Sequence, residues 1–219
     1  MKYEIIIIFT LIINGVIISL SKYSTNGDIM TRQEQKEKRR IEILYKGLEL
    51  FVEKGYDATK TIDIANALNI SEGLLFHYFK TKEDLYYELV RLGINGTNKE
   101  IINNNLKPVD QLLKYVTDIF NAVKLDINFA RMFVLMPEAT KIGTPKRVRE
   151  LALSVNIIDL YIPIIIKGQE EGTIKQGDPF ILSNALFRSI YGVCEGYALD
   201  SNNTLPDPSL MIDIIRRYE

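Results

Sequence analysis

The chain has 219 residues, with 27 lysines and arginines against 28 aspartates and glutamates, so its formal net charge is −1. This balance excludes a protein that binds nucleic acid through overall positive charge, and any such affinity must come from a local motif. The single Cys194 excludes an intrachain disulfide framework and a cysteine-based metal site, and it suits a reducing compartment.

The first feature in chain order is the apolar run Ile5–Leu20, which is slightly shorter than the roughly 20 residues that normally cross a bilayer. A secretory signal is the least favoured interpretation, because no good small-residue cleavage site follows the run. A membrane anchor is a second interpretation, since the basic residues from Arg32 to Arg40 would hold the rest of the chain in the cytoplasm. We favour a third, in which Met30 is the true start and residues 1–29 are a translated apolar leader.

A first amphipathic helix is predicted from Gln33 to Lys54, because its apolar residues recur at spacings of three and four and therefore share one face. These residues are Ile41, Leu44, Tyr45, Leu48, Phe51 and Val52. Gly55 is a natural stop, since glycine readily adopts the left-handed backbone that ends a helix. The loop Tyr56–Lys60 then leads into the next segment.

Residues 61–85 read as a helix-turn-helix. We expect Thr61 to cap a first short helix, Asn69 to end it in a left-handed turn, and Ser71 to cap a second helix. Leu75 and Phe79 lie one helical turn apart and should face inward. The remaining positions of the second helix then turn progressively outward, and these are Glu72, Gly73, Leu74, Phe76, His77 and Tyr78.

The segment LNISEGLLFHYFKTKEDL resembles the DNA-binding domain of tetracycline-repressor-like (TetR/AcrR) transcriptional regulators, and the resemblance covers Arg40 to about Val90. It implies base-edge or groove contacts from the second helix and phosphate contacts around it. The implied groove contacts are Glu72, Gly73, Leu74 and Phe76, and the implied phosphate contacts are Thr61, Tyr78 and Lys82. The sequence departs from the common family pattern at Asn69, Leu74 and Phe76. The last two lack hydroxyls, so we expect them to contact thymine methyl groups.

His77 is the only histidine of the chain. Catalysis would need a second member of a catalytic set, or a second metal ligand, and neither lies near it in the sequence. We therefore interpret His77 as an amphipathic ring at a boundary between protein and DNA. No enzymatic activity, cofactor or metal is expected.

Further helices are predicted downstream. A connecting helix should begin at Thr81, with Asp84 three residues on. The others are expected over Val109–Leu125, Asn128–Glu138, Lys146–Glu171 with an interruption at Pro163, Pro179–Leu199 and Pro208–Tyr218. The predicted fold is thus all-α, with a three-helix DNA-binding domain over residues 30–80 and a larger helical effector-binding and dimerisation domain over residues 81–219.

Small residues recur on one face of the predicted helix Pro179–Leu199. Ala185, Ser189, Gly192 and Gly196 lie there beside Leu182, and small residues let a second helix approach closely. Packing of this face within the chain is the alternative, and the family resemblance favours a homodimer. Other aromatic or soft residues could line an effector cavity or belong to the core: Tyr115, Phe120, Phe129, Met132, Phe133, Met136, Tyr161 and Tyr191.

These observations predict a cytoplasmic, dimeric repressor that binds a palindromic operator in double-stranded DNA and is released by a small apolar effector. The first alternative is a helical small-molecule-binding protein or enzyme without DNA binding. The second is the same regulator tethered to a membrane, if residues 5–20 are retained.

Overall fold

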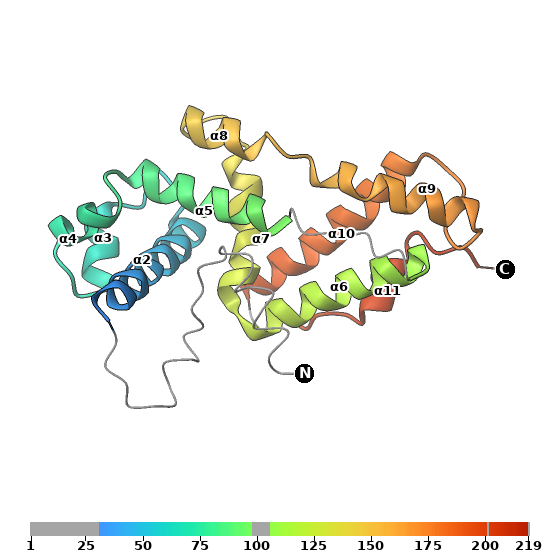
Figure 1. Cartoon of the computed structure of the whole chain (residues 1–219), viewed down its shortest axis with the longest axis horizontal. Helices are drawn as coiled ribbons and strands as arrows, with labels where there is room; N and C mark the ends of the chain where they lie inside the picture. Colours follow the sequence, from blue (N-terminus) through green and yellow to red (C-terminus); the bar gives the residue numbers. More distant parts are fainter. Residues whose placement is uncertain (1–30, 98–105, 201, 219) are drawn as a thin grey trace. The chain divides into compact units, whose positions relative to one another are not determined.

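The computed structural model describes residues 31–97, 106–200 and 202–218, and these residues form helices joined by short turns (Figure 1). The apolar leader at 1–29 and the run Asn103–Asn105 lie outside the described residues. The helices are α2 Arg32–Lys54, α3 Thr61–Ala67, α4 Glu72–Tyr78, α5 Lys82–Thr97, α6 Pro108–Leu125, α7 Ile127–Ala139, α8 Lys146–Ala152, the 3-10 turn η2 Ile157–Leu160, α9 Ile162–Glu170, α10 Pro179–Leu199 and α11 Pro208–Asp213.

The described residues divide into two compact units. The first contains those up to Gly96 together with Val134–Ser154, and the second contains those of Thr97–Phe133 and Val155–Glu219. The only β pairing among the described residues is an isolated bridge between Ile174 and Arg216, so the all-α prediction is confirmed.

The core of the first unit comes from the amphipathic face of α2 and from α3, α4 and α5. Side chains of this core that are at most 1% exposed include Ile43, Leu44, Leu48, Ile64, Leu75 and Leu85. Gly47 lets α2 approach α5 closely, since a Cβ built there would lie 2.8 Å from Leu85 Cδ2. The apolar residues of α2 therefore form one buried face of a small core shared by these helices, as their spacing predicts.

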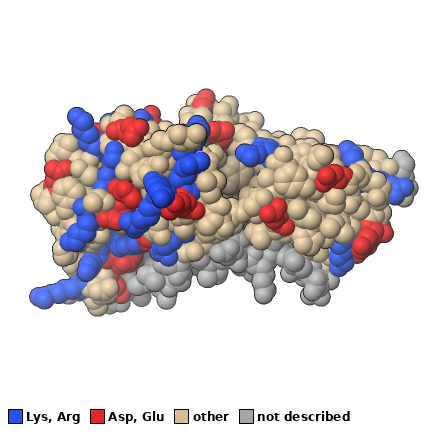
Figure 2. Space-filling model, turned by 90° about the horizontal axis from the view of Figure 1, so that it is seen from above, with Lys and Arg blue, Asp and Glu red and all other residues tan. Residues whose placement is uncertain are grey.

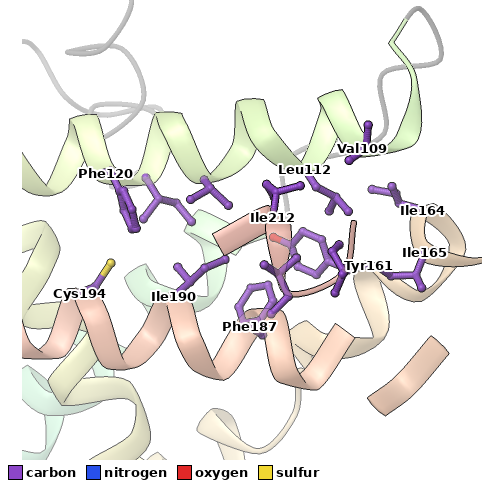
Figure 3. Close-up of a cluster of buried hydrophobic side chains, with 14 of the residues drawn as sticks. Val109, Leu112, Phe120, Tyr161, Ile164, Ile165, Phe187, Ile190, Cys194 and Ile212 are labelled. Carbon is purple, nitrogen blue, oxygen red and sulfur yellow. The ribbon is translucent and has the colours of Figure 1, made fainter. Parts of the chain in front are cut away.

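The core of the second unit lies between α6, α9, α10 and α11 (Figure 3). Leu112 and Val116 of α6 are fully buried, and Leu186 and Ile190 of α10 are each 1% exposed. Pro108 opens α6, where its missing N–H costs nothing. Asp178 caps α10 by accepting hydrogen bonds from the backbone N–H groups of Phe180 and Ile181.

The prediction of one long helix over Lys146–Glu171, interrupted at Pro163, is wrong in where the interruption lies. The structure ends α8 at Ala152, and the side chain of Asn156 caps the separate turn η2 by accepting from Ile158 N at 3.2 Å. Pro163 lies in the first turn of α9, so it opens a helix rather than kinking one. By length and composition Lys146–Glu170 is the one described stretch that could cross a membrane, which is weak evidence because helices of soluble proteins also pass this test.

Two predicted boundaries also differ from the structure. Thr61 is the first residue of α3, and the cap position is Lys60. The last helix ends at Asp213 rather than Tyr218, because the backbone beyond it pairs with an earlier turn: Lys175 N donates to Ile215 O at 2.9 Å and Arg217 N donates to Thr173 O at 3.1 Å.

Candidate nucleic-acid interface

The start of α4 is fixed by a turn and a cap. Asn69 has φ of 54°, the left-handed value predicted for this position, and it is the only described residue other than glycine with positive φ. Ser71 Oγ then accepts a hydrogen bond from Leu74 N at 3.1 Å, which confirms Ser71 as the cap. Leu75 is fully buried and Phe79 is 5% exposed, so the inward face of α4 is also as predicted.

The opposite face of α4 is open. Gly73, Leu74 and His77 are exposed, whereas Glu72, Phe76 and Tyr78 are half-buried. Leu74 is 39% exposed. The His77 and Tyr78 rings meet edge to face with centroids 5.5 Å apart. The predicted groove-contacting residues are therefore together on one short helix whose outer side is uncovered within the described residues.

Gly73 is not required by the packing of the chain. A Cβ built on it meets only Ser71 Oγ, 4.0 Å away, and its φ is not positive. A glycine in a helix is less stable than alanine by roughly 1 kcal/mol, so this one disfavours the helix with no compensation inside the protein. The close approach of DNA at Gly73 stays a prediction.

Thr61 and Glu72 contact each other across the two helices of the motif. Thr61 Oγ1 donates to Glu72 Oε1 at 2.5 Å, which joins the start of α3 to the start of α4. Glu72 also lies in the first turn of α4, where a carboxylate complements the helix dipole. A phosphate contact from the Thr61 hydroxyl would have to replace this hydrogen bond, so the contacts predicted for both residues stay predictions.

Lys82 begins α5, one residue after the predicted start at Thr81, and its ammonium group is used within the protein. Lys82 Nζ donates to the carbonyl oxygens of Tyr56 at 2.6 Å and Thr59 at 2.9 Å, and it lies 4.1 Å from the centre of the Tyr56 ring. Burial lowers the pKa of Lys82, which reflects partial removal of the ammonium from water. The predicted phosphate contact is not tested by this arrangement, because backbone N–H groups in the first turn of α5 can also bind a phosphate.

Sequence reasoning missed the bonds that hold the loop before α3. Thr59 is fully buried, and its hydroxyl donates to Leu50 O at 3.0 Å and to Gly55 O at 2.7 Å. Together with Lys82, Thr59 fixes where α3 begins relative to α2 and α5. A buried threonine hydroxyl paired with backbone carbonyls leaves no periodic signal in the sequence.

Sequence reasoning also missed a charge network inside this unit. Glu88 of α5 accepts hydrogen bonds from Arg91 Nε at 2.7 Å and from Arg40 of α2. Burial alone would raise the pKa of Glu88, but the hydrogen bonds from Arg91 and Arg40 outweigh burial and lower it. The pair Glu88 and Arg91 could have been predicted from its helical spacing of three residues. The contact with Arg40, 48 residues away in the sequence, could not.

Charge around the motif is mixed rather than uniformly basic. Figure 2 shows Lys and Arg side chains interspersed with Asp and Glu over the part of this face that the first unit forms. Arg39 pairs with Glu42 at 2.7 Å, while Lys36, Lys38 and Lys80 are exposed. Attraction for DNA phosphates would therefore fall to individual exposed cations such as these rather than to a uniformly basic face.

Comparison with known proteins agrees with this geometry. Residues 43–89 match the family model described as bacterial regulatory proteins, tetR family. The chain is 28% identical over 144 residues to the HTH-type transcriptional repressor KstR2 of Rhodococcus jostii, covering 64% of this chain and 70% of that protein. It is 29% identical over 138 residues to IcaR, a negative transcriptional regulator of the biofilm operon icaADBC in Staphylococcus aureus, covering 59% of this chain and 73% of that protein.

Solved structures share the fold. The structure of the ketosteroid transcriptional regulator KstR2 of Mycobacterium tuberculosis matches with a TM-score of 0.64 at 19% identity, covering 88% of this chain and 98% of that one. At that identity the match establishes the helical architecture alone. The matched residues 43–89 include the open helix α4 and the turn and cap that place it. Residues 43–89 are therefore similar to bacterial regulatory proteins of the tetR family.

Proposed function

We propose that the chain is a dimeric repressor that binds a palindromic operator through α4 and is released from it by a small, mainly apolar effector. The observation that carries the proposal is the open face of α4, where Gly73, Leu74 and His77 are exposed while Leu75 on the other side is fully buried. A short helix held in this way fits the major groove, with its N-terminal residues at the base edges. The proposed place of action is the cytoplasm.

The proposed dimer interface is the small-residue face of α10, formed by Leu182, Ala185, Ser189, Gly192 and Gly196. A Cβ built on Gly192 or Gly196 meets no atom within 4 Å. The buried side of α10 is carried by Ser183, Leu186, Phe187, Ile190 and Cys194, and Leu182 at the edge of the proposed interface packs partly against that core. Two exposed apolar side chains of the same helix, Ile181 at 62% and Leu199 at 64%, add surface that a partner helix would cover.

Dimerisation and operator release are coupled in this proposal by the spacing of the two reading helices. Half-sites of a palindrome are about 34 Å apart, one turn of B-DNA, and a dimer whose α4 helices are further apart or closer engages only one of them. The dimer would have one conformation in which the two α4 helices match the half-sites and another in which they do not. An effector that binds the second conformation more tightly shifts the population toward it and releases the operator. The family relatives are named as repressors, which favours repression over activation for this chain.

The test is a titration of the purified chain against DNA from its own promoter region, with a scrambled duplex of the same length as control. We expect a specific complex whose affinity falls steeply as salt rises, because lysine and arginine contacts to phosphate release counterions. Leu74→Ala should change preference at one base pair of the operator, since Leu74 is the exposed apolar side chain of α4. Equal weakening on every operator variant would contradict a reading role for Leu74, and no specific complex with the unmodified chain would refute the proposed function.

The comparisons do not favour the alternative of a helical enzyme or ligand-binding protein without DNA binding, since they point to a DNA-binding regulator. The membrane-tethered version depends on residues 5–20, which lie outside the described residues. Mass spectrometry of the native N-terminus decides between the tether and the translated leader.

A further inference from the structure

The side of α10 that faces away from its own core carries a regular line of residues. This outer stripe of α10 consists of Ile181, Ala185, Arg188, Gly192, Glu195 and Leu199. Its spacings alternate between four and three residues, which keeps side chains in line along one face of a helix. Five of the six residues are exposed, and Ala185 is half-buried. Figure 3 shows Phe187, Ile190 and Cys194 of the same helix pointing toward α6. The stripe is therefore the uncovered side of α10 within the described residues.

The outer stripe has an apolar residue at each end and opposite charges between them. Ile181 is 62% exposed and Leu199 is 64% exposed. Arg188 and Glu195 lie seven residues apart, which is about 10 Å along the helix axis. Neither of the two charged side chains forms an ion pair with another described residue. The stripe thus offers both apolar surface and two unpaired charges of opposite sign.

The outer stripe is complementary to a second copy of itself that runs in the opposite direction. Its spacings of four, three, four, three and four residues read the same in both directions. An antiparallel copy aligned about the middle of the stripe therefore places Ile181 opposite the partner's Leu199. Arg188 then lies opposite the partner's Gly192. Because a Cβ built on Gly192 meets no atom within 4 Å, this position leaves room for the arginine side chain to pass.

The same alignment brings the two charges of the stripe together across the interface. Glu195 of the partner subunit lies one layer beyond the partner's Gly192, which is about 4.5 Å along the axis from Arg188. That separation is within reach of an arginine side chain, and the twofold axis repeats the pair, so two ion pairs form. A parallel alignment would place each charge beside its own copy, and like charges at close range repel.

We infer that two copies of the chain associate through antiparallel α10 helices, in the register that pairs Arg188 with the partner's Glu195 at two places. The inference rests on the dimer of the proposed function and adds the direction and register of its helices. Ion pairs between packed helices set orientation and partner choice more than they add affinity. The two pairs therefore select the antiparallel dimer, while Ile181 and the partner's Leu199 supply apolar contact at each end.

The test measures the dissociation constant of the dimer by sedimentation equilibrium for variants with reversed charges. Arg188→Glu leaves two acids on each stripe and Glu195→Arg leaves two bases, so each change should raise the dissociation constant at least about tenfold. The two changes together restore both pairs with their charges exchanged. The double variant should therefore return to within about threefold of the unmodified chain.

The matched control is Lys124→Glu, which changes the net charge as Arg188→Glu does, at an exposed position of α6. It should leave the dissociation constant of the dimer unchanged. Circular dichroism should show the same helix content in every variant, because the substituted residues are exposed. Recovery of the dimer in the double variant excludes misfolding as the cause of the single effects.

Three results would overturn the inferred register. They are single variants that dimerise as tightly as the unmodified chain, a double variant that is no tighter than the single ones, and an unmodified chain that is monomeric. The masses are measured without DNA, and operator binding is titrated separately on the same preparations.

The failure of the register and the failure of the proposed function are distinguishable. A chain that dimerises and binds its operator but shows no effect of charge reversal would overturn the register alone. A chain whose charges can be exchanged as expected, but which forms no specific operator complex, would refute the proposed function and support the register.

Discussion

At the scale of single residues, two helical glycines differ in whether the packing of the chain requires them. Gly168 of α9 is required by packing, since a Cβ built there would lie 2.4 Å from Ile174 Cδ1 and 3.2 Å from Ile174 Cβ, and Ile174 is fully buried. Gly73 of α4 has only open space around it. The same substitution should therefore have opposite effects on stability at the two positions.

Gly168→Ala should destabilise the chain by about 1 to 3 kcal/mol, the usual cost of forcing an extra methyl group into a packed site. Gly73→Ala should stabilise it by up to about 1 kcal/mol, because alanine loses less backbone entropy in a helix. Urea unfolding of both variants measures the two changes. If Gly73→Ala also leaves operator affinity unchanged, close approach of DNA at this position is wrong, since the added methyl would then meet nothing.

Lys82→Ala tests whether the ammonium of this residue binds phosphate or holds the loop. The structure has Nζ on the carbonyl oxygens of Tyr56 and Thr59, so its removal should loosen the loop and weaken binding to all operator variants alike. If the ammonium stays on these carbonyl oxygens when DNA binds, the slope of log affinity against log salt should stay the same, because no phosphate contact is lost. A slope reduced by about one would instead place the ammonium on a phosphate. Lys80→Ala is the comparison: Lys80 is exposed, so if its ammonium attracts DNA its removal should reduce the slope by about one.

At the scale of elements, the pair α2 and α5 is held by Glu88, whose side chain is 13% exposed and which bonds to Arg40 and Arg91. Glu88→Gln should destabilise the chain by about 2 kcal/mol near neutral pH, as expected for hydrogen bonds to a charged group. The folded-state pKa of Glu88 is below its ordinary value of 4.5. The stabilisation is therefore present above that value and is lost as pH falls through the folded-state pKa.

Urea unfolding of the unmodified chain and of Glu88→Gln at neutral pH and at about pH 3 measures this pH dependence. The difference between the two should be largest at neutral pH and should shrink toward zero in acid. The control is Glu53→Gln on the exposed part of α2, which should show almost no difference at either pH. A difference that persists unchanged in acid would mean that Glu88 acts through packing rather than charge.

Elements with a local physical cause could be predicted from the sequence. The turn at Asn69, the cap at Ser71 and the buried pair Leu75 and Phe79 each depend on residues within one or two helical turns. The helix α10 was also predicted with both ends correct, because Asp178 and Pro179 mark its start. Local sequence thus determined the boundaries and the faces of these helices.

Features that depend on distant residues could not be predicted. The break within residues 146–171 is an exception, because its cause is local: the Asn156 side chain accepts from Ile158 N, and the apolar spacing of the segment hid that signal. Residues 214–218 leave the helix because their backbone pairs with the turn at 173–175, about 40 residues earlier. At the candidate site, the same reason hid the Thr61 to Glu72 hydrogen bond and the loop contacts of Lys82.

At the scale of the whole molecule, the proposed function requires two copies of the chain, and α10 offers a face for the second. Gly192 is exposed and has no atom within 4 Å of a built Cβ. A substitution there should not disturb the core of its own chain, whose contacts from α10 are on the side of Leu186 and Ile190. A change of oligomeric state in a Gly192 variant would therefore report on the proposed interface of α10 and not on the core.

Gly192→Glu should convert the chain to a folded monomer, because it places a carboxylate and extra volume where the two α10 helices would meet. Light scattering after size exclusion measures the mass, and circular dichroism should show unchanged helix content. Operator affinity should fall by about a hundredfold or more, since one chain engages one half-site and loses the gain from linked binding. Lys124→Gln, which changes net charge by the same amount at an exposed position of α6, should remain dimeric. A Gly192→Glu chain that stays dimeric with full operator affinity would exclude this face of α10 as the interface.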